Sequence, residues 1–214
     1  KLKKEAKEAT LATKQKLVDL TIDLNTKNSA SSPALNYGYF FLEELYQSLG
    51  IGSFFKNVQK KYKFTYDINE IFKLLSFGRF LQPDSKAGTC EQQTSYFKEF
   101  KTELKDIYRA LDVLNDEKEN LQMHIHKAIT KQYGRDCTLV FYDVTNYYFE
   151  TEIQDELRKK GVSKEHRPQP IVQMGLFIDQ NGIPIGYKLF SGSTNDTSTM
   201  IPILEEMKEK FSLG

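Results

Sequence analysis

The sequence predicts an α+β protein in which a helical part comes first and a mostly extended part follows. Up to about residue 133, apolar residues recur every three or four positions, which is the spacing of one helix face. After Asp136 the apolar residues form short runs whose alternate members point to opposite sides, the period of β-strands. Between two of these runs stands Asn181-Gly182, the strongest short signal for a β-hairpin.

Composition limits the class of protein. The chain has 214 residues, of which 39% are hydrophobic and 28% charged, enough for one large or two small globular domains. A formal net charge of +1 does not indicate a nucleic-acid partner, so local clusters of basic residues must support that inference. Cys90 and Cys137 are isolated, which fits a reducing cytoplasm and argues against a zinc ribbon or a disulfide framework. We find no apolar run that spans a bilayer and no signal peptide, so we expect a cytoplasmic protein without membrane contact.

Three regions are expected along the chain. Residues 1–33 have the composition of a lysine-rich amino-terminal helix followed by a polar linker. Residues 34–135 form the helical part, in which Gly50 and Gly134 end helices and Asp67 caps one. Its helices are predicted at 37–49, 54–62, after 67, after 83–86, at 101–114 and at 116–133. We expect the helix after Asp67 to turn these apolar residues inward: Ile68, Ile71, Phe72, Leu75 and Phe80.

Residues 136–214 contain the extended part. Strands are predicted at 138–145, 171–179 and 183–190, and 147–150 continue the first strand past a bend. Residues 152–170 are polar and read as a mobile basic loop. A last helix is expected at 197–211, with Met200, Ile203, Leu204, Met207 and Phe211 inward.

Asp143 is the residue on which the functional interpretation depends. The strand that contains it is apolar on both sides, a pattern typical of a central strand covered from above and below. A carboxylate at the end of such a strand is costly to bury unless a positive or hydrogen-bonding group meets it. A divalent metal, a backbone N–H or a lysine would each meet that need.

Other residues near Asp143 in sequence are candidates for contacts to phosphate or to metal. Thr145 lies two residues on and shares its face, where β-propensity explains it equally well. The loop contains a basic cluster that could neutralise DNA phosphates, because we expect the loop to leave and re-enter the sheet beside Asp143, or could be solvated like any flexible loop. Its members are Lys159, Lys160, Lys164, His166 and Arg167. Glu150, Glu152 and Asp155 are read as solvated charges at the mouth of the loop. His124 and His126 lie two apart on a helix, point to different sides, and are read as structural.

The order strand, loop, hairpin, helix, with an acid on the first strand, is how an RNase H-like mixed sheet begins. Three stretches carry a more specific resemblance, and 79–86 upstream adds to it. They are Phe-Tyr-Asp-Val-Thr at 141–145, 161–167 with 173–176, and 182–186 with 190–196. Together they resemble the amino-terminal portion of bacterial insertion-sequence transposases of the DDE type. The resemblance extends from about Tyr37 to the end of the chain.

The resemblance implies a function. In this family three carboxylates hold two divalent metals, Mg²⁺ or Mn²⁺, which drive DNA strand cleavage and transfer. Asp143 matches the first carboxylate, and the second and third would lie beyond Gly214. Asp196 opens a helix, so an N-cap explains it better than a metal ligand. The resemblance also implies that 34–135 binds DNA, that the partners are transposon ends, and that the full-length protein is a homodimer.

These expectations leave alternatives. A fragment with one carboxylate is expected to be inactive alone, and it could instead act as a non-catalytic DNA-end-binding or regulatory module. An RNase H-like nuclease would need its remaining acids within this chain. In an RNase H-like sheet the fourth strand lies beside the first. The strand at 138–144 is therefore expected at a sheet edge, exposed or paired with another copy.

Overall fold

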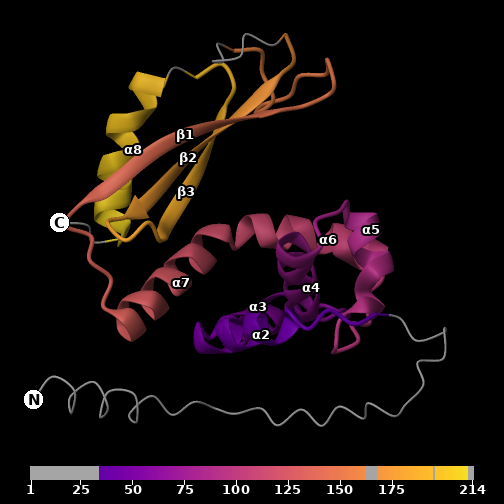
Figure 1. Ribbon diagram of the computed structural model, residues 1–214. Helices are drawn as coiled ribbons and strands as arrows, with labels where there is room; N and C mark the ends of the chain where they lie inside the picture. Colours follow the sequence, from indigo (N-terminus) through magenta and orange to yellow (C-terminus); the bar gives the residue numbers. More distant parts are fainter. Residues whose placement is uncertain (1–33, 162–167, 195, 212–214) are drawn as a thin grey trace, which may run out of the picture. The chain divides into compact units, whose positions relative to one another are not determined.

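The computed structural model describes residues 34–161, 168–194 and 196–211. In these residues the protein is α+β, as predicted, with helices first, then a three-stranded sheet and a last helix (Figure 1). Leu35–Gly214 form one compact unit. The predicted helix at 1–27 lies outside the described residues. The elements are α2 Tyr39–Ser48, α3 Ile51–Tyr62, α4 Ile68–Leu81, α5 Lys86–Glu91, a 3-10 helix Gln92–Ser95, α6 Leu104–Asp116, α7 Lys118–Tyr133, β1 Val140–Tyr148, β2 Ile171–Asp179, β3 Pro184–Ser191 and α8 Asp196–Phe211.

The helices begin and end where local chemistry predicts. The Asp67 side chain accepts a hydrogen bond from the backbone N–H of Glu70, which caps α4. Ser85 caps α5 in the same way, through the N–H of Gly88. Gly134 ends α7 with a φ of 66°, a left-handed conformation that favours glycine.

The helical core is built around α4. Ile68 and Leu74 are completely buried, and the core continues with apolar residues of α2, α3 and α6. The prediction that Phe80 faces inward is wrong, because its side chain is 75% exposed. Phe80 belongs to the last turn of α4, beyond Phe77, the last apolar residue of this helix that is buried in the core.

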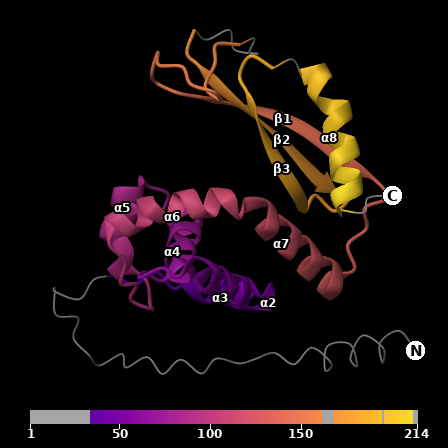
Figure 2. The same cartoon turned by 180° about the vertical axis from the view of Figure 1, so that it is seen from behind.

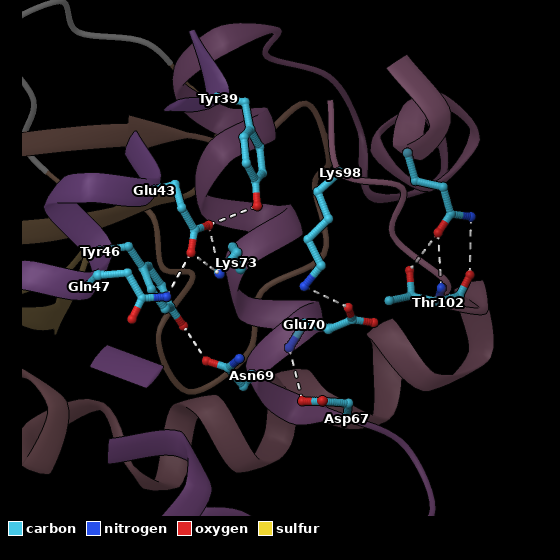
Figure 3. Close-up of polar contacts among 11 residues, drawn as sticks. Tyr39, Glu43, Tyr46, Gln47, Asp67, Asn69, Glu70, Lys73, Lys98 and Thr102 are labelled. Atoms are coloured by element: carbon cyan, nitrogen blue, oxygen red, sulfur yellow. Dashed lines mark hydrogen bonds and ion pairs between the residues drawn. The ribbon is translucent and has the colours of Figure 1, made fainter. Parts of the chain in front are cut away.

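A buried ion pair joins α2 to α4 inside this core. The ammonium of Lys73 lies 2.7 and 2.8 Å from the two carboxylate oxygens of Glu43 (Figure 3). The Tyr39 hydroxyl and the Gln47 amide also donate to Glu43, at 2.8 and 2.7 Å. Lys73 is only 4% exposed, so this hydrogen-bond set is what makes its burial tolerable.

The sheet has the order β1-β2-β3, and both neighbouring pairs are antiparallel. β2 has the predicted limits. β1 begins at Val140 and continues to Tyr148, pairing along its whole length with β2. Asp143 therefore stands within the strand rather than at its end. In the described part of the chain β1 is an edge strand, as predicted from the layout of the resembling fold.

One face of the sheet is covered and the other is open. Helix α8 lies along the covered face, as both views show (Figures 1 and 2), and its Ile203, Met207 and Phe211 pack against Phe177 and Ile185. On the opposite face, here called the open face, β1 residues are exposed in strict alternation. Register and alternation give its strand residues: Phe141, Asp143, Thr145, Tyr147, Val172, Met174, Leu176, Ile178, Tyr187, Leu189 and Ser191.

The expectation that β1 is covered on both faces is therefore wrong for the described residues. Phe141 and Tyr147 on the open face are 49% and 46% exposed. β1 also has a strand neighbour on one side only. An apolar pattern on both faces looks the same in sequence whether or not a second layer covers the sheet.

Helix α7 connects the helical core to the sheet. The side-chain oxygen of Gln122 accepts a hydrogen bond of 2.7 Å from the backbone N–H of Tyr187. Lys210 of α8 lies 2.7 Å from Glu119. His124 contacts the carbonyl of Leu49, whereas the ring of His126 lies 5.1 Å from that of Phe211.

Candidate functional site around Asp143

β1 presents Asp143 on the open face. Asp143 is the fourth residue of the strand and pairs with Leu176 of β2. Phe141 and Thr145 precede and follow it on the same face, two residues away. Among the strand residues of this face that the structure describes, Asp143 is the single charged one. A lone carboxylate thus stands on an otherwise apolar and weakly polar surface.

The environment of Asp143 differs from the one expected. Its side chain is exposed, so water solvates the carboxylate and no burial cost calls for a partner. Within the described residues neither a lysine nor a backbone N–H bonds to it. The carboxylate is therefore accessible to an external cation.

The described residues contain no group of three or more His, Cys, Asp or Glu side chains that could hold a metal ion. Asp143 would contribute one oxygen ligand, and the rest of a coordination shell would come from water, from phosphate oxygens or from further protein. Hard cations such as Mg²⁺ accept such a mixed oxygen shell. The residues present therefore fit one ligand of a metal site.

Thr145 shares the face and the exposure of Asp143. It pairs with Met174, whose sulfur lies 3.7 Å from the hydroxyl of Tyr147. The Thr145 hydroxyl is thus free to face a ligand at the open face, although its residue type equally suits an ordinary strand.

The basic loop returns to the sheet farther from Asp143 than expected. The backbone of Lys159 pairs with Ile171, with N–O distances of 3.2 and 2.9 Å. Ile171 is five residues from Leu176 along β2, which corresponds to about 17 Å. The main chain of Lys159 therefore lies across β2 from β1 and level with Tyr148, the last residue of β1, rather than beside Asp143. Lys164, His166 and Arg167 lie outside the described residues.

Lys160 lies among acidic residues. It lines a cavity of about 420 Å³ together with Glu150 and Glu152, and all three are exposed. Asp155 pairs with Arg158 instead, at 2.6 Å. The backbone N–H and then the side chain of Arg158 hold the pKa of Asp155 below its ordinary value. These acids behave as loop charges, as expected.

A cationic cavity beside α7 was not anticipated from the sequence. It has a volume of about 870 Å³, and its lining includes Lys127, Lys131, Arg135 and Lys210. Lys127 and Lys131 are exposed and four residues apart, so they stand on one helix face. That spacing was the signal available in the sequence.

Arg135 and Asp179 form a buried pair that sequence reasoning also missed. Their side chains are 0% and 2% exposed, and the Arg135 Nε lies 3.5 Å from Asp179 Oδ2. The other oxygen of Asp179 accepts the N–H groups of Asn181 and Ile183, both at 2.9 Å. Burial, and then the Arg135 charge, lower the pKa of His126. This cluster is structural: it ties the hairpin to the segment after α7.

Cys90 and Cys137 are free and half-buried, and each packs at the margin of an apolar cluster.

No helix in the described ranges is long and apolar enough to cross a membrane. Comparison with models of protein families, with curated proteins and with solved structures found no match.

Proposed function

We propose that this chain is the amino-terminal part of a DNA transposase of the DDE type and that Asp143 is its first metal-binding carboxylate. The observation that carries the proposal is the position of Asp143. Asp143 is accessible and is the single charged residue among the described strand residues of the open face. Its strand is followed by an antiparallel hairpin and a covering helix. This order matches the start of an RNase H-like fold, and the motifs around Asp143 resemble those of the family.

The chemistry follows from oxygen ligation. When bound, divalent cations activate the attacking oxygen and stabilise the leaving oxygen of a phosphodiester. Asp143 supplies one ligand and holds the cation near the surface of the sheet. The resembling proteins use three carboxylates, so the described residues bind and position but do not complete the reaction.

DNA contact is assigned to lysines. Lys127 and Lys131 stand on one face of α7 beside the cationic cavity, and Lys159 and Lys160 stand at the base of the loop. Each lysine that neutralises a phosphate releases counterions, so binding should weaken steeply with salt. Phosphate contacts of this kind position the duplex without reading its sequence.

A second function is a non-catalytic module that occupies transposon ends or regulates the full enzyme. The observation that favours it is the lack, among the described residues, of a three-acid group around Asp143. Both functions share DNA binding, and they differ in whether Asp143 takes part through a metal.

DNA binding can be tested by fluorescence anisotropy with labelled duplex at low and moderate salt. We expect the Lys127→Ala/Lys131→Ala variant to bind DNA at least tenfold more weakly. The slope of the logarithm of the binding constant against the logarithm of the salt concentration should become shallower by about 2. Lys56→Ala/Lys60→Ala is the matched control, because these lysines are also exposed and four apart on one helix. The control should change affinity less than twofold. No binding by the unaltered chain at low salt contradicts the proposal.

Catalysis is tested separately with a nicking and strand-transfer assay in Mg²⁺ or Mn²⁺. We expect the 214-residue chain to show no cleavage above background. Robust cleavage that disappears in Asp143→Ala would instead support an RNase H-like nuclease whose remaining acids lie within this chain.

A further inference from the structure

We propose that Gly161 and Gly192 are positioning residues for the lysines with which the basic loop begins. Their main chains cross without room for a side chain, and this contact fixes the loop base, residues 155–160, before DNA binds. The inference rests on the DNA-binding function proposed above. It assigns a role in binding to two glycines that contribute no charge.

The loop base is joined to the sheet through main-chain hydrogen bonds. The N–H of Lys159 donates to the carbonyl of Ile171 at 3.2 Å, and the N–H of Ile171 donates to the carbonyl of Lys159 at 2.9 Å. The N–H of Gly192 donates to the carbonyl of Leu157 at 3.1 Å. The loop base therefore lies against the start of β2 and the turn that follows β3.

Local hydrogen bonds also define the path of the loop base. One carboxylate oxygen of Asp155 accepts the N–H groups of Leu157 and Arg158 at 3.0 and 2.6 Å. The N–H of Asp155 donates to the carbonyl of Arg158 at 3.0 Å. The N–H of Lys160 donates to the side-chain oxygen of Gln154 at 3.2 Å. These bonds give the loop base a defined main-chain path within the polar segment 152–170.

Gly161 and Gly192 stand where these segments cross. A Cβ on Gly192 would overlap the carbonyl oxygens of Lys159 and Ile171, which are the two acceptors of the paired hydrogen bonds. A Cβ on Gly161 would overlap the carbonyl oxygen of Gly192. Neither glycine has a positive φ, so lack of space rather than backbone conformation excludes a side chain at both positions.

The contact between the two glycines matters because it determines where the lysines can meet a phosphate. Lys160 is exposed and Lys159 is half-buried, and within the described residues no ion pair engages either ammonium group. A loop base that is already ordered loses less conformational freedom when its lysines bind phosphate, so the same contacts give tighter binding. Substitution of either glycine should therefore weaken DNA binding without removing a positive charge.

Hydrogen exchange tests the contact itself. In Gly192→Ala the amides of Lys159 and Ile171 should exchange at least tenfold faster relative to amides of α4, because the added methyl group displaces both acceptors. Gly182→Ala is the matched control, since a Cβ at that position would meet nothing within 4 Å. In the control the amides of Lys159 and Ile171 should keep their rates relative to those of α4.

Fluorescence anisotropy with labelled duplex tests the role in binding. We expect Gly192→Ala and Gly161→Ala each to bind DNA at least threefold more weakly than Gly182→Ala. The slope of the logarithm of the binding constant against the logarithm of the salt concentration should stay the same, since every lysine is still present. Lys159→Ala/Lys160→Ala should instead make that slope shallower by about 2.

Circular dichroism shows whether each variant is folded at the temperature of the binding measurement. If Gly192→Ala does not fold, Gly161→Ala decides the question, because its Cβ would overlap the peptide group after Gly192 and not the paired carbonyls of Lys159 and Ile171.

Two results would overturn the inference and leave the proposed function standing. One is unchanged exchange at the amides of Lys159 and Ile171 in Gly192→Ala. The other is DNA binding by both glycine variants that is as tight as binding by Gly182→Ala. Absence of DNA binding by the unaltered chain would instead contradict the proposed function, and with it the role given to the two glycines.

Discussion

At the scale of single residues, the best-defined chemistry in the molecule is the buried contact of Glu43 with Lys73. Burial raises the pKa of Glu43, but hydrogen bonds from Gln47, Lys73 and Tyr39 outweigh this and hold the pKa below its ordinary value. The carboxylate is thus stabilised as an anion inside the helical core (Figure 3). Asp143 is the opposite case, an exposed carboxylate whose role depends on what it meets from outside.

A pH dependence follows from Glu43. Its pKa is lower in the folded chain than in the unfolded chain, where it is about 4.3. The stabilisation is therefore complete above that value and is lost as the pH falls through the lower, folded pKa. We expect urea unfolding at pH 7 and at pH 3.5 to show a smaller loss of stability in Glu43→Gln than in the unaltered chain. An equal loss in both chains would show that other carboxylates govern the acid response.

At the scale of elements, the hairpin of β2 and β3 was predicted most accurately, because local chemistry specifies it. Gly182 has a φ of 76°, and Asp179 accepts N–H groups within the turn. The limits of β1 were harder to predict, since Asn146 interrupts the apolar run and Tyr147 and Tyr148 suit a strand or a bend equally. The pairing with β2 shows that β1 continues through Tyr147 and Tyr148 without a shift in register.

Gly182 gives a prediction for this turn. A Cβ added at Gly182 would meet nothing within 4 Å, so a substitution costs only the strain of a positive φ. We expect Gly182→Ala to lower the free energy of unfolding by about 1 kcal/mol. Gly182→Asn should cost less, since asparagine tolerates the left-handed region. Thermal unfolding of the two variants measures this, and equal costs would contradict the conformational explanation.

At the scale of the whole molecule, contacts between segments distant in sequence hold the sheet to the helices, and these were not predictable. Arg135 and Asp179 are 44 residues apart in the sequence. Considered separately, Arg135 is a charged residue after the end of a helix and Asp179 is a charged residue at the end of a strand, so neither indicates the other as its partner. The position of the basic loop was missed for the same reason: its return point depends on the pairing of Lys159 with Ile171. By contrast, local pattern placed Asp143 on a strand of a sheet without knowledge of its neighbours.

Substitution of Arg135 tests how the helices and the sheet are coupled. Its guanidinium also donates to the carbonyl of Pro184 at 3.0 Å, at the start of β3. Arg135→Met leaves Asp179 buried without its ion pair, which we expect to cost about 3 kcal/mol. Hydrogen exchange should then speed up at the Tyr187 amide, which bonds to Gln122, more than at amides of α4. Uniformly faster hydrogen exchange throughout the chain would mean that Arg135 stabilises the whole fold rather than the contact between the helices and the sheet.

We propose that Asp143 binds a divalent cation next to DNA. Titration of the ¹⁵N-labelled chain with Mn²⁺, with and without duplex DNA, tests it most directly, because Mn²⁺ broadens the NMR signals of nearby amides. We predict selective broadening at Asp143, Val144 and Leu176, strengthened by DNA and abolished in Asp143→Asn. Broadening that persists in Asp143→Asn, or that centres on Glu150 and Glu152, would contradict the claim.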